Sequence, residues 1–213
     1  MLGFAACSGR VERGGGRMLY IARHGETDWN RQKRFQARVD VPLNDTGRGQ
    51  AAALRALFRE RGVVFSRAWC SPLGRARETL EIVLDGSGVP WQPEPALLEL
   101  SLGEFEGCLE ADLQRDRGAE FDAWRARHFL EAAPGGESIG DGMVRVAGLL
   151  AALRAPASAG DVLVVGTQGA NMALKAALSG DVTVSSVAGY KQANDEVDVW
   201  QADPPAFVER LRV

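Results

Sequence analysis

The chain has 213 residues with a formal net charge of −3, and 46% of them are hydrophobic, which is typical of one globular domain and excludes intrinsic disorder. Its pI near 5.5 argues against nucleic-acid or acidic-membrane binding by bulk charge, and no apolar run is long enough to cross a membrane. Three cysteines and two histidines are too few for a disulfide framework or a histidine-rich metal centre, so we expect a cytoplasmic protein with no metal and no cofactor.

The first segment of the chain ends in a glycine-rich sequence. Residues 1–17 end in RVERGGGR and are expected to form a flexible leader, with Met18 as the natural start or the first ordered residue. Residues 18–22, MLYIA, are an apolar run without a helical period, which predicts a buried strand. The run stops at the polar sequence RHGET.

The middle of the chain alternates between helix and strand signals. Asp45 and Thr46 are the expected N-cap of an amphipathic helix that Gly62 ends. Residues 63–71 predict a second strand, and Pro72 suits the first turn of the helix that follows it.

A loop-rich stretch separates these elements from the second half. Residues 90–107 are expected to form loops, and residues 109–130 an irregular helix. Residues 137–154 predict a further amphipathic helix. Glu137 is most simply a carboxylate that the helix dipole favours at the N-terminus, and the alternative is a contact with the substrate.

The end of the chain gives the clearest strand signal. Residues 161–167, DVLVVGT, predict a buried strand that leads into a helix through Leu178. Residues 197–201 and 207–213 are short alternating segments that predict an edge hairpin.

Together the elements predict an α/β fold. Strands that alternate with helices are typical of a three-layer α/β/α sandwich around a mostly parallel sheet. We expect residues 18–213 to form one domain, with a helical insert at about 107–136.

The polar residues that follow the predicted strands form a candidate site, because open parallel sheets bind ligands where strands end and helices begin. The candidates are Arg23, His24 and Gly25 after the first strand, Ser71 and Arg75 after the second, Gln168 and Gly169 after the third, and Glu99, Glu104 and Glu106 in a loop. This set suits a phosphoryl group. Two guanidinium groups can hold it bidentately, a neutral imidazole can attack phosphorus, and a carboxyl can protonate the leaving oxygen.

The same residues also have simpler interpretations, in which they play no part in catalysis. His24 alone is consistent with a structural histidine at a strand end, and Arg75 with a surface cation. Glu99 competes with Glu104 and Glu106 for the role of proton donor, and we favour Glu99 because it precedes the glycine-flanked GEFEG element.

Five segments in the same order resemble the histidine phosphatase superfamily, in the branch related to cofactor-dependent phosphoglycerate mutase. They are RHGETDWN (23–30), PLNDTGRGQA (42–51), SPLGRARET (71–79), ELSLGEFEG (99–107) and PGGES (134–138). The resemblance covers roughly residues 18–200 and implies a phosphoglycerate mutase-like fold.

The resemblance also assigns roles to individual residues. It implies that His24 is the phosphorylated nucleophile, that Arg23 and Arg75 bind the phosphate, that Asn30 lies at the phosphate pocket and that Glu99 is the proton donor.

One departure from the family pattern concerns the residue after the last parallel strand. The family carries a second histidine there, whereas this chain has Gln168. Glutamine donates a neutral hydrogen bond that is roughly half as strong as a charge-assisted one, so we expect a rate loss of about 10²–10³ or less. The neighbouring Gly169 is expected to let the backbone approach the phosphate.

The sequence therefore predicts a slow phosphatase that hydrolyses small phosphomonoesters through phospho-His24. The main alternative is a non-catalytic module that binds a phosphorylated ligand. A phosphoglycerate mutase is a lesser alternative, because no extra basic cluster is evident for a second anion. We expect a small phosphorylated metabolite as the substrate, with specificity in residues 109–134, no nucleic-acid or membrane partner, and a monomer or homodimer.

Overall fold

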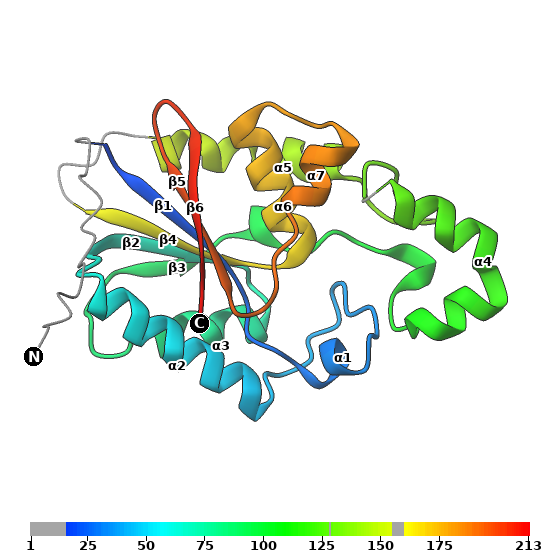
Figure 1. The fold of residues 1–213 in the computed structure, drawn as a ribbon, viewed down its shortest axis with the longest axis horizontal. Coiled ribbons are helices and arrows are strands. Elements are labelled where there is room, and N and C mark those ends of the chain that lie inside the picture. The colour runs from blue at the N-terminus through cyan, green and yellow to red at the C-terminus, as the bar shows by residue number, and fades with distance from the viewer. Residues whose placement is uncertain (1–15, 128, 155–159) are drawn as a thin grey trace, which may run out of the picture.

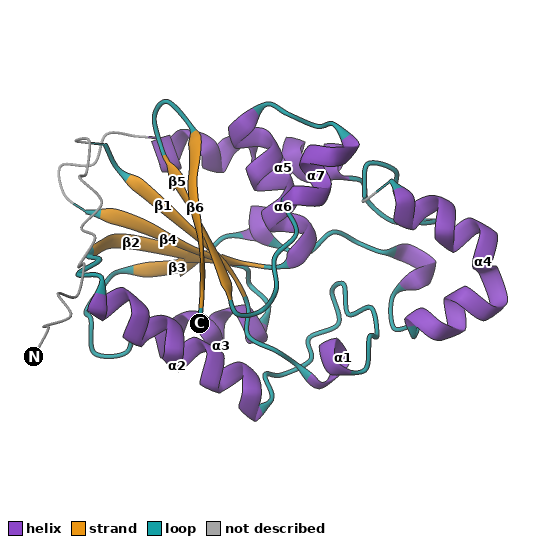
Figure 2. Ribbon diagram, in the orientation of Figure 1, coloured by secondary structure: helices purple, strands orange, loops and turns teal. Residues whose placement is uncertain are grey.

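The computed structural model describes residues 16–127, 129–154 and 160–213, so the predicted leader lies outside the described residues except at its last two positions. A six-stranded sheet of order β3-β2-β4-β1-β5-β6 forms the centre, with α2 and α3 on one face and α5 and α6 on the other (Figures 1 and 2). The α/β sandwich predicted from the sequence is confirmed. Within the described ranges, no helix combines the length and apolar character needed to span a membrane.

The sheet is parallel on one side and antiparallel on the other. Its strands are β1 (Met18–Arg23), β2 (Phe65–Cys70), β3 (Trp91–Pro93), β4 (Asp161–Gly166), β5 (Glu196–Gln201) and β6 (Ala206–Arg212). The first four run parallel, while β5 and β6 form the predicted antiparallel hairpin at one edge. β3 lies where we expected only loop, because a three-residue edge strand leaves no periodic signal.

Five of the helices were predicted and differ from the predictions mainly at their ends, whereas α1 and α7 were not predicted. They are α1 (Asp28–Arg31), α2 (Asp45–Glu60), α3 (Gly74–Leu84), α4 (Glu110–Ala126), α5 (Ile139–Arg154), α6 (Gln168–Ser179) and α7 (Val184–Gly189). The predicted N-cap of α2 is wrong by one residue, because Asn44 accepts the hydrogen bond from Gly47 N. The prediction for Glu137 is also wrong, because it lies before α5 and its carboxylate accepts a hydrogen bond from Ser101 N.

Two apolar clusters hold the layers together, and a third lies away from the sheet. The four inner strands are almost fully buried, as expected for strands covered on both faces. α4 projects beyond the sheet (Figure 1) and packs through its own aromatic cluster, which is built around Phe105, Phe121 and Trp124. That helix lies within the predicted insert.

The register of the parallel strands places the candidate site. Arg23 at the end of β1 pairs with Gly166 at the end of β4, and Cys70 at the end of β2 pairs with Val165. The residues that follow the three strands therefore emerge at the same edge of the sheet.

A buried ion pair ties the helical layer to the antiparallel edge. Lys175 of α6 is fully buried and donates to Asp198 Oδ2 of β5 at 2.6 Å, and Arg210 Nε of β6 donates to Asp198 Oδ1 at 2.6 Å. Burial lowers the pKa of Lys175 to about 8, although Asp198 opposes that shift.

We predict that Asp198→Ala lowers the free energy of unfolding by about 3–5 kcal/mol, because it leaves the Lys175 ammonium buried without its carboxylate. Arg210→Ala should cost less, since the Arg210 side chain is 32% exposed and Lys175 keeps its partner. Urea denaturation followed by tryptophan fluorescence measures both values, and equal losses would contradict this account.

Candidate active site

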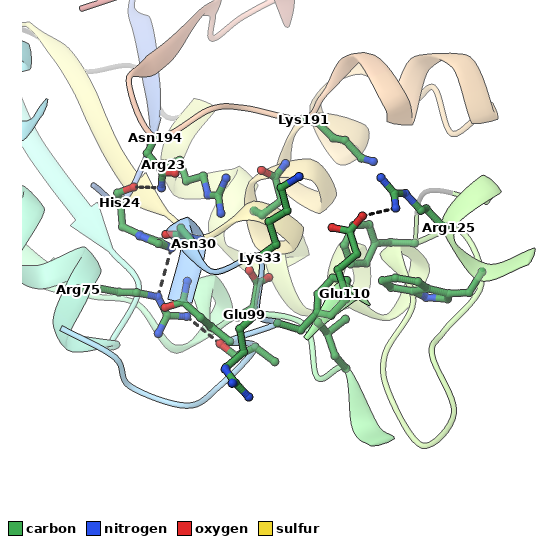
Figure 3. A pocket seen from close by; sticks show the side chains of 18 of the residues that line it. Arg23, His24, Asn30, Lys33, Arg75, Glu99, Glu110, Arg125, Lys191 and Asn194 are labelled. Atoms are coloured by element: carbon green, nitrogen blue, oxygen red, sulfur yellow. Dashed lines mark hydrogen bonds and ion pairs between the residues drawn. The ribbon is translucent and has the colours of Figure 1, made fainter. Parts of the chain in front are cut away.

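A cavity of about 380 Å³ opens at the edge of the sheet where β1, β2 and β4 end. Its inner end is lined by Arg23, His24, Asn30, Arg75, Glu99, Gln168 and Asn194 (Figure 3). Of the seven residues predicted to act in catalysis or phosphate binding, all but Gly169 therefore lie together, although they come from four separate stretches of the chain. Asn194 was not predicted, because nothing in its local sequence marks it.

His24 is held in one orientation by both ring nitrogens. Its Nδ1 lies 2.7 Å from Gly25 O, and Arg75 Nε donates to its Nε2 at 3.2 Å. A carbonyl oxygen accepts only, so Nδ1 carries the proton and Nε2 presents its lone pair. Asn194 Nδ2 donates to His24 O at 2.7 Å and fixes the backbone as well.

The surroundings of His24 keep the ring neutral. The side chain is 2% exposed, and burial lowers its pKa well below the ordinary value of 6.5. The nearby cations Arg75 and Arg23 lower it further, while the hydrogen bond to Gly25 opposes the shift. A neutral imidazole attacks an electrophile through the lone pair of its unprotonated nitrogen, which is Nε2 here.

Arg23 supplies hydrogen-bond donors that the protein does not use. Its Nη1 donates to Gln192 O at 3.1 Å, but its buried Nε has no partner in the described part of the chain. Burial lowers the pKa of Arg23 to about 10, with Glu99 opposing the shift, so the group stays cationic at neutral pH. A buried N–H without an acceptor is rare and suggests a ligand site.

Arg75 is more fully engaged than predicted. The side chain is 1% exposed, and its Nη1 and Nη2 donate to Val39 O and Ala37 O, each at 2.7 Å. With the contact to His24, three of its five N–H groups are occupied. The guanidinium group predicted to bind phosphate therefore also holds the loop that contains Ala37 and Val39. In this loop Ala37 adopts a φ of +42°.

Asn30 and Gln168 present neutral amide donors to the cavity. Asn30 Oδ1 accepts from Thr27 N and from the Thr27 hydroxyl, at 3.1 and 3.2 Å, so its oxygen is occupied by the helix cap. Gln168 Nε2 is buried without a hydrogen-bond partner among the described residues. With Arg23 Nε it forms a set of donors that a ligand rich in oxygen atoms would satisfy.

Glu99 lies against the N-terminus of α6. Its Oε1 accepts from Leu100 N, Gly169 N and Ala170 N, at 2.8, 2.9 and 3.2 Å, whereas its Oε2 receives no hydrogen bond from any described residue. The N–H of Gly169, predicted to contact phosphate, is thus used by Glu99, and Gly169 does not line the cavity. A Cβ on Gly169 would lie 2.6 Å from Oε1, so glycine is needed for this approach.

The two competing carboxylates point elsewhere. Glu104 forms an ion pair with Arg117 at 2.8 Å, and Glu106 Oε1 accepts from Arg38 N at 3.0 Å. Neither lines the cavity. Of the three candidates, only Glu99 is therefore placed to exchange a proton with a ligand there.

The outer end of the cavity carries cations that sequence reasoning missed. They are Lys33, Arg34, Arg125 and Lys191, and Glu110 is the carboxylate paired with Arg125. Figure 3 shows Lys191 and Arg125 pointing toward one another on the side away from Arg75. The pKa of Lys191 is lowered first by burial and then by Arg125, while Glu110 opposes the shift. The expectation that the chain has no second basic cluster is therefore wrong.

The donor set does not resemble a metal site. Among the described residues, no group of three or more histidine, cysteine, aspartate and glutamate side chains is arranged to hold a metal ion. The inner end of the cavity is rich in N–H donors, which suit an anion.

Comparison with known proteins identifies a family whose model spans nearly the whole chain. A family model described as Histidine phosphatase superfamily (branch 1) matches residues 19–209. A 2,3-bisphosphoglycerate-dependent phosphoglycerate mutase from Beijerinckia indica is 36% identical over 134 residues, which make up 61% of this chain and 64% of the mutase. The adenosylcobalamin/alpha-ribazole phosphatase of Salmonella typhimurium is 34% identical over 71% of this chain and 74% of that enzyme. The match thus spans less than two thirds of the mutase's length.

Solved structures share the fold. A mycobacterial glucosyl-3-phosphoglycerate phosphatase in complex with VO3 superposes with a TM-score of 0.77 at 28% identity, covering 87% of this chain and 92% of that one. The alpha-ribazole phosphatase from Shigella flexneri superposes with a TM-score of 0.73 at 27% identity, covering 86% and 90%.

We predict that the stability of the protein falls below about pH 6.5 partly because of His24. The unfolded histidine binds a proton there, whereas the folded ring, whose pKa is depressed, does not, so the contribution is complete above pH 6.5 and is lost as the pH falls. His24→Gln should remove this dependence, whose slope is at most about 1.4 kcal/mol per pH unit for one proton.

Urea denaturation of both proteins across this range provides the measurement. Parallel curves for wild type and His24→Gln would show that the folded ring takes up a proton as readily as the unfolded one.

Proposed function

The chain belongs to branch 1 of the histidine phosphatase superfamily, and we propose that it hydrolyses small phosphomonoesters through a phosphohistidine at His24. The observation that carries the proposal is the Nε2 lone pair of a neutral, buried ring, which lies at the inner end of a cavity with unused N–H donors. This arrangement suits attack on a phosphoryl group, whose oxygens would accept those donors.

In the first step, the phosphoryl group is held by the guanidinium groups of Arg23 and Arg75 and by the amides of Asn30 and Gln168. His24 Nε2 attacks phosphorus, so that an N–P bond forms and the P–O bond to the alcohol breaks. The electron pair of that bond stays on the departing oxygen, which takes a proton from Glu99. The proton is carried on Oε2, because Oε1 accepts three backbone hydrogen bonds.

In the second step, water attacks the phosphoryl group. Glu99 takes a proton from that water as its oxygen bonds to phosphorus, and the electron pair of the N–P bond returns to Nε2. Inorganic phosphate leaves, and the neutral ring and the protonated carboxyl are restored.

Gln168 is the reason why we expect hydrolysis to be slow. By resemblance it stands where the family carries its second histidine, and its Nε2 is free to donate to a phosphoryl oxygen. A neutral donor stabilises developing negative charge less than a cationic one, so the proposed enzyme is slow. The same residue favours the rival view of a non-catalytic phospho-ligand-binding module. The nucleophile and the Glu99 carboxyl at the same cavity favour an enzyme.

The relatives support small phosphorylated metabolites as substrates. Their names specify phosphatases of alpha-ribazole and glucosyl-3-phosphoglycerate compounds and a bisphosphoglycerate-dependent mutase. A cavity of about 380 Å³ has room for a phosphoryl group together with a leaving group of that general size.

One observation favours phosphoglycerate mutase as a second candidate. A mutase binds substrates that are anionic at both ends, and the outer end of the cavity holds Lys33 and Lys191, whose ammonium groups have no ion-pair partner among the described residues. Arg125 is close by but is paired with Glu110.

We predict that wild-type protein hydrolyses p-nitrophenyl phosphate slowly, that His24→Ala does not, and that Gln168→His is about 10- to 100-fold faster because it restores a cationic donor. Release of p-nitrophenolate measures the rates. Alkaline quenching with phosphoryl-labelled substrate, followed by loss of the label in acid, tests for the acid-labile N–P bond. Activity that survives in His24→Ala would exclude the covalent mechanism. No turnover by wild type, with full rescue by Gln168→His, would favour the binding module.

We predict that the double variant Lys33→Ala/Lys191→Ala lowers kcat/KM about 5- to 30-fold for esters that carry a carboxylate or a second phosphate, since each lost ion pair costs up to about 1 kcal/mol. Hydrolysis of p-nitrophenyl phosphate should be unchanged. Arg61→Ala, which removes a cation paired with Glu209 outside the cavity, is the control. Equal effects on both kinds of ester would show that the outer cations do not select anionic substrates.

A further inference from the structure

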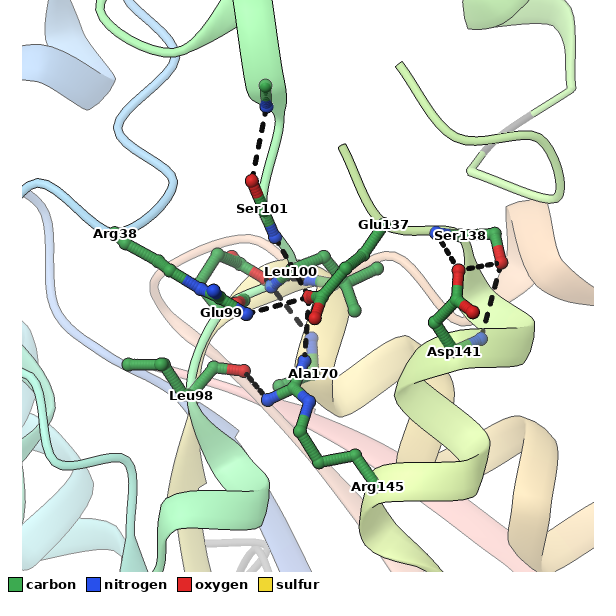
Figure 4. A network of polar contacts seen from close by, with 12 residues as sticks. Arg38, Leu98, Glu99, Leu100, Ser101, Glu137, Ser138, Asp141, Arg145 and Ala170 are labelled. Atoms are coloured by element: carbon green, nitrogen blue, oxygen red, sulfur yellow. Dashed lines mark hydrogen bonds and ion pairs between the residues drawn. The ribbon is translucent and has the colours of Figure 1, made fainter. Parts of the chain in front are cut away.

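A carboxylate outside the cavity joins two arginines behind Glu99. Glu137 Oε2 accepts from Arg38 Nη2 at 2.9 Å, from Arg145 Nη2 at 3.2 Å and from Ser101 N at 3.0 Å (Figure 4). None of these four residues lines the cavity. They come from three distant parts of the chain and meet at one oxygen atom.

Each member of this network also holds the backbone next to Glu99. Arg38 Nε donates to Glu99 O at 3.0 Å, and Arg145 Nη1 donates to Leu98 O. Glu137 itself accepts from Ser101 N, two residues after Glu99. The segment from Leu98 to Ser101 is therefore fixed at three of its four residues by groups that converge on Glu137.

The same network reaches the other side of the site through the loop that holds Arg38. The residues on either side of it, Ala37 and Val39, provide the carbonyl oxygens that accept from Arg75. Arg38 thus connects the loop that orients Arg75 with the backbone that carries Glu99.

Among the residues that the structure describes, Glu137 is also the only acidic group that the guanidinium groups of Arg38 and Arg145 share. Among the described residues, neither Arg38 nor Arg145 forms an ion pair with another carboxylate. Without the Glu137 charge the two cations repel one another, and Ser101 N loses its acceptor. The backbone at Glu99 then loses its fixed position, and proton transfer requires placement to within a fraction of an ångström.

We propose that Glu137 is a positioning residue, which acts through Arg38 and Arg145 to place the Glu99 carboxyl beside the leaving oxygen. This inference rests on the proposed function, in which Glu99 protonates that oxygen as the P–O bond breaks. Its signature is a dependence on the leaving group. An alkoxide needs the proton, whereas p-nitrophenolate is a stable anion that departs without it.

The test compares kcat/KM for glycerol phosphate and for p-nitrophenyl phosphate, because this ratio reports the step in which the leaving group departs. In Glu137→Gln, the value for glycerol phosphate falls tenfold or more, while that for p-nitrophenyl phosphate stays within about twofold. Glu99→Gln shows the same selectivity with a larger loss. Arg38→Lys keeps the charge but cannot contact Glu99 O and Glu137 together, so it shows the same selective loss and serves if Glu137→Gln does not fold.

Asp141→Asn is the matched control. Asp141 lies four residues from Glu137 and caps the start of α5 through Ser138, with no contact to the Glu99 segment. This variant leaves the ratio between the two substrates unchanged.

The outcomes separate the two proposals. Equal losses for both esters in Glu137→Gln or in Arg38→Lys, or a selective loss in Asp141→Asn, overturn the positioning role while leaving the phosphatase intact. A wild-type protein that hydrolyses neither ester overturns the proposed function and this inference with it.

Discussion

The site depends on an imidazole that is kept neutral between two guanidinium groups. Protonating His24 would place a third cation in a buried region beside Arg23 and Arg75, and the lowered pKa of the ring expresses that cost. The protein offsets the burial of the arginines with backbone carbonyls and with carboxylates, which are Glu99 for both arginines and also Asp40 and Glu106 for Arg75. Much of the surrounding geometry follows from this arrangement, including the loop at Ala37 and Val39, whose carbonyl oxygens turn toward Arg75.

The site also requires the backbone beside His24 to approach the start of α2 closely, and glycine on both sides allows this. A Cβ on Gly25 would lie 2.4 Å from Gly47 O, and one on Gly47 would lie 2.2 Å from Glu26 O. The start of α2 can therefore pack directly against the segment that carries His24. The N–H of Gly25 donates to Thr79 Oγ1 of α3 at 3.0 Å, so α2 and α3 both fix the backbone next to the nucleophile candidate.

The inner end of the cavity was predictable from sequence because it follows a topological rule. Parallel strands end at one edge, so the polar residues after β1 and β4 meet, as His24 and Gln168 do. The outer end obeys no such rule. Lys33, Arg125 and Lys191 belong to a turn, the end of α4 and a loop after α7, and only the packing of those elements brings them to one cavity. The sequence also could not predict which backbone N–H and C=O groups the site residues would bond.

Gly169 is an example of a backbone contact that the sequence did not predict. Its place after a strand suggested contact with a ligand, but its N–H is used by Glu99, which comes from a loop about seventy residues earlier in the chain. A side chain with two oxygens can accept at one and exchange a proton at the other, and the sequence alone does not reveal which partner occupies the first.

The charges at the inner end link the binding of a phosphoryl group to the chemistry proposed for it. With Arg23 and Arg75 cationic, His24 neutral and Glu99 ionised, the formal charge is +1, which leaves a phosphoryl dianion one charge in excess. When the Glu99 carboxyl carries a proton, the two arginines balance the dianion, and this is the state in which Glu99 can donate. A neutral Gln168 preserves that balance, whereas a protonated histidine at the same position would supply the missing charge without Glu99. The glutamine therefore makes the charge balance of the bound dianion depend more strongly on the protonated carboxyl.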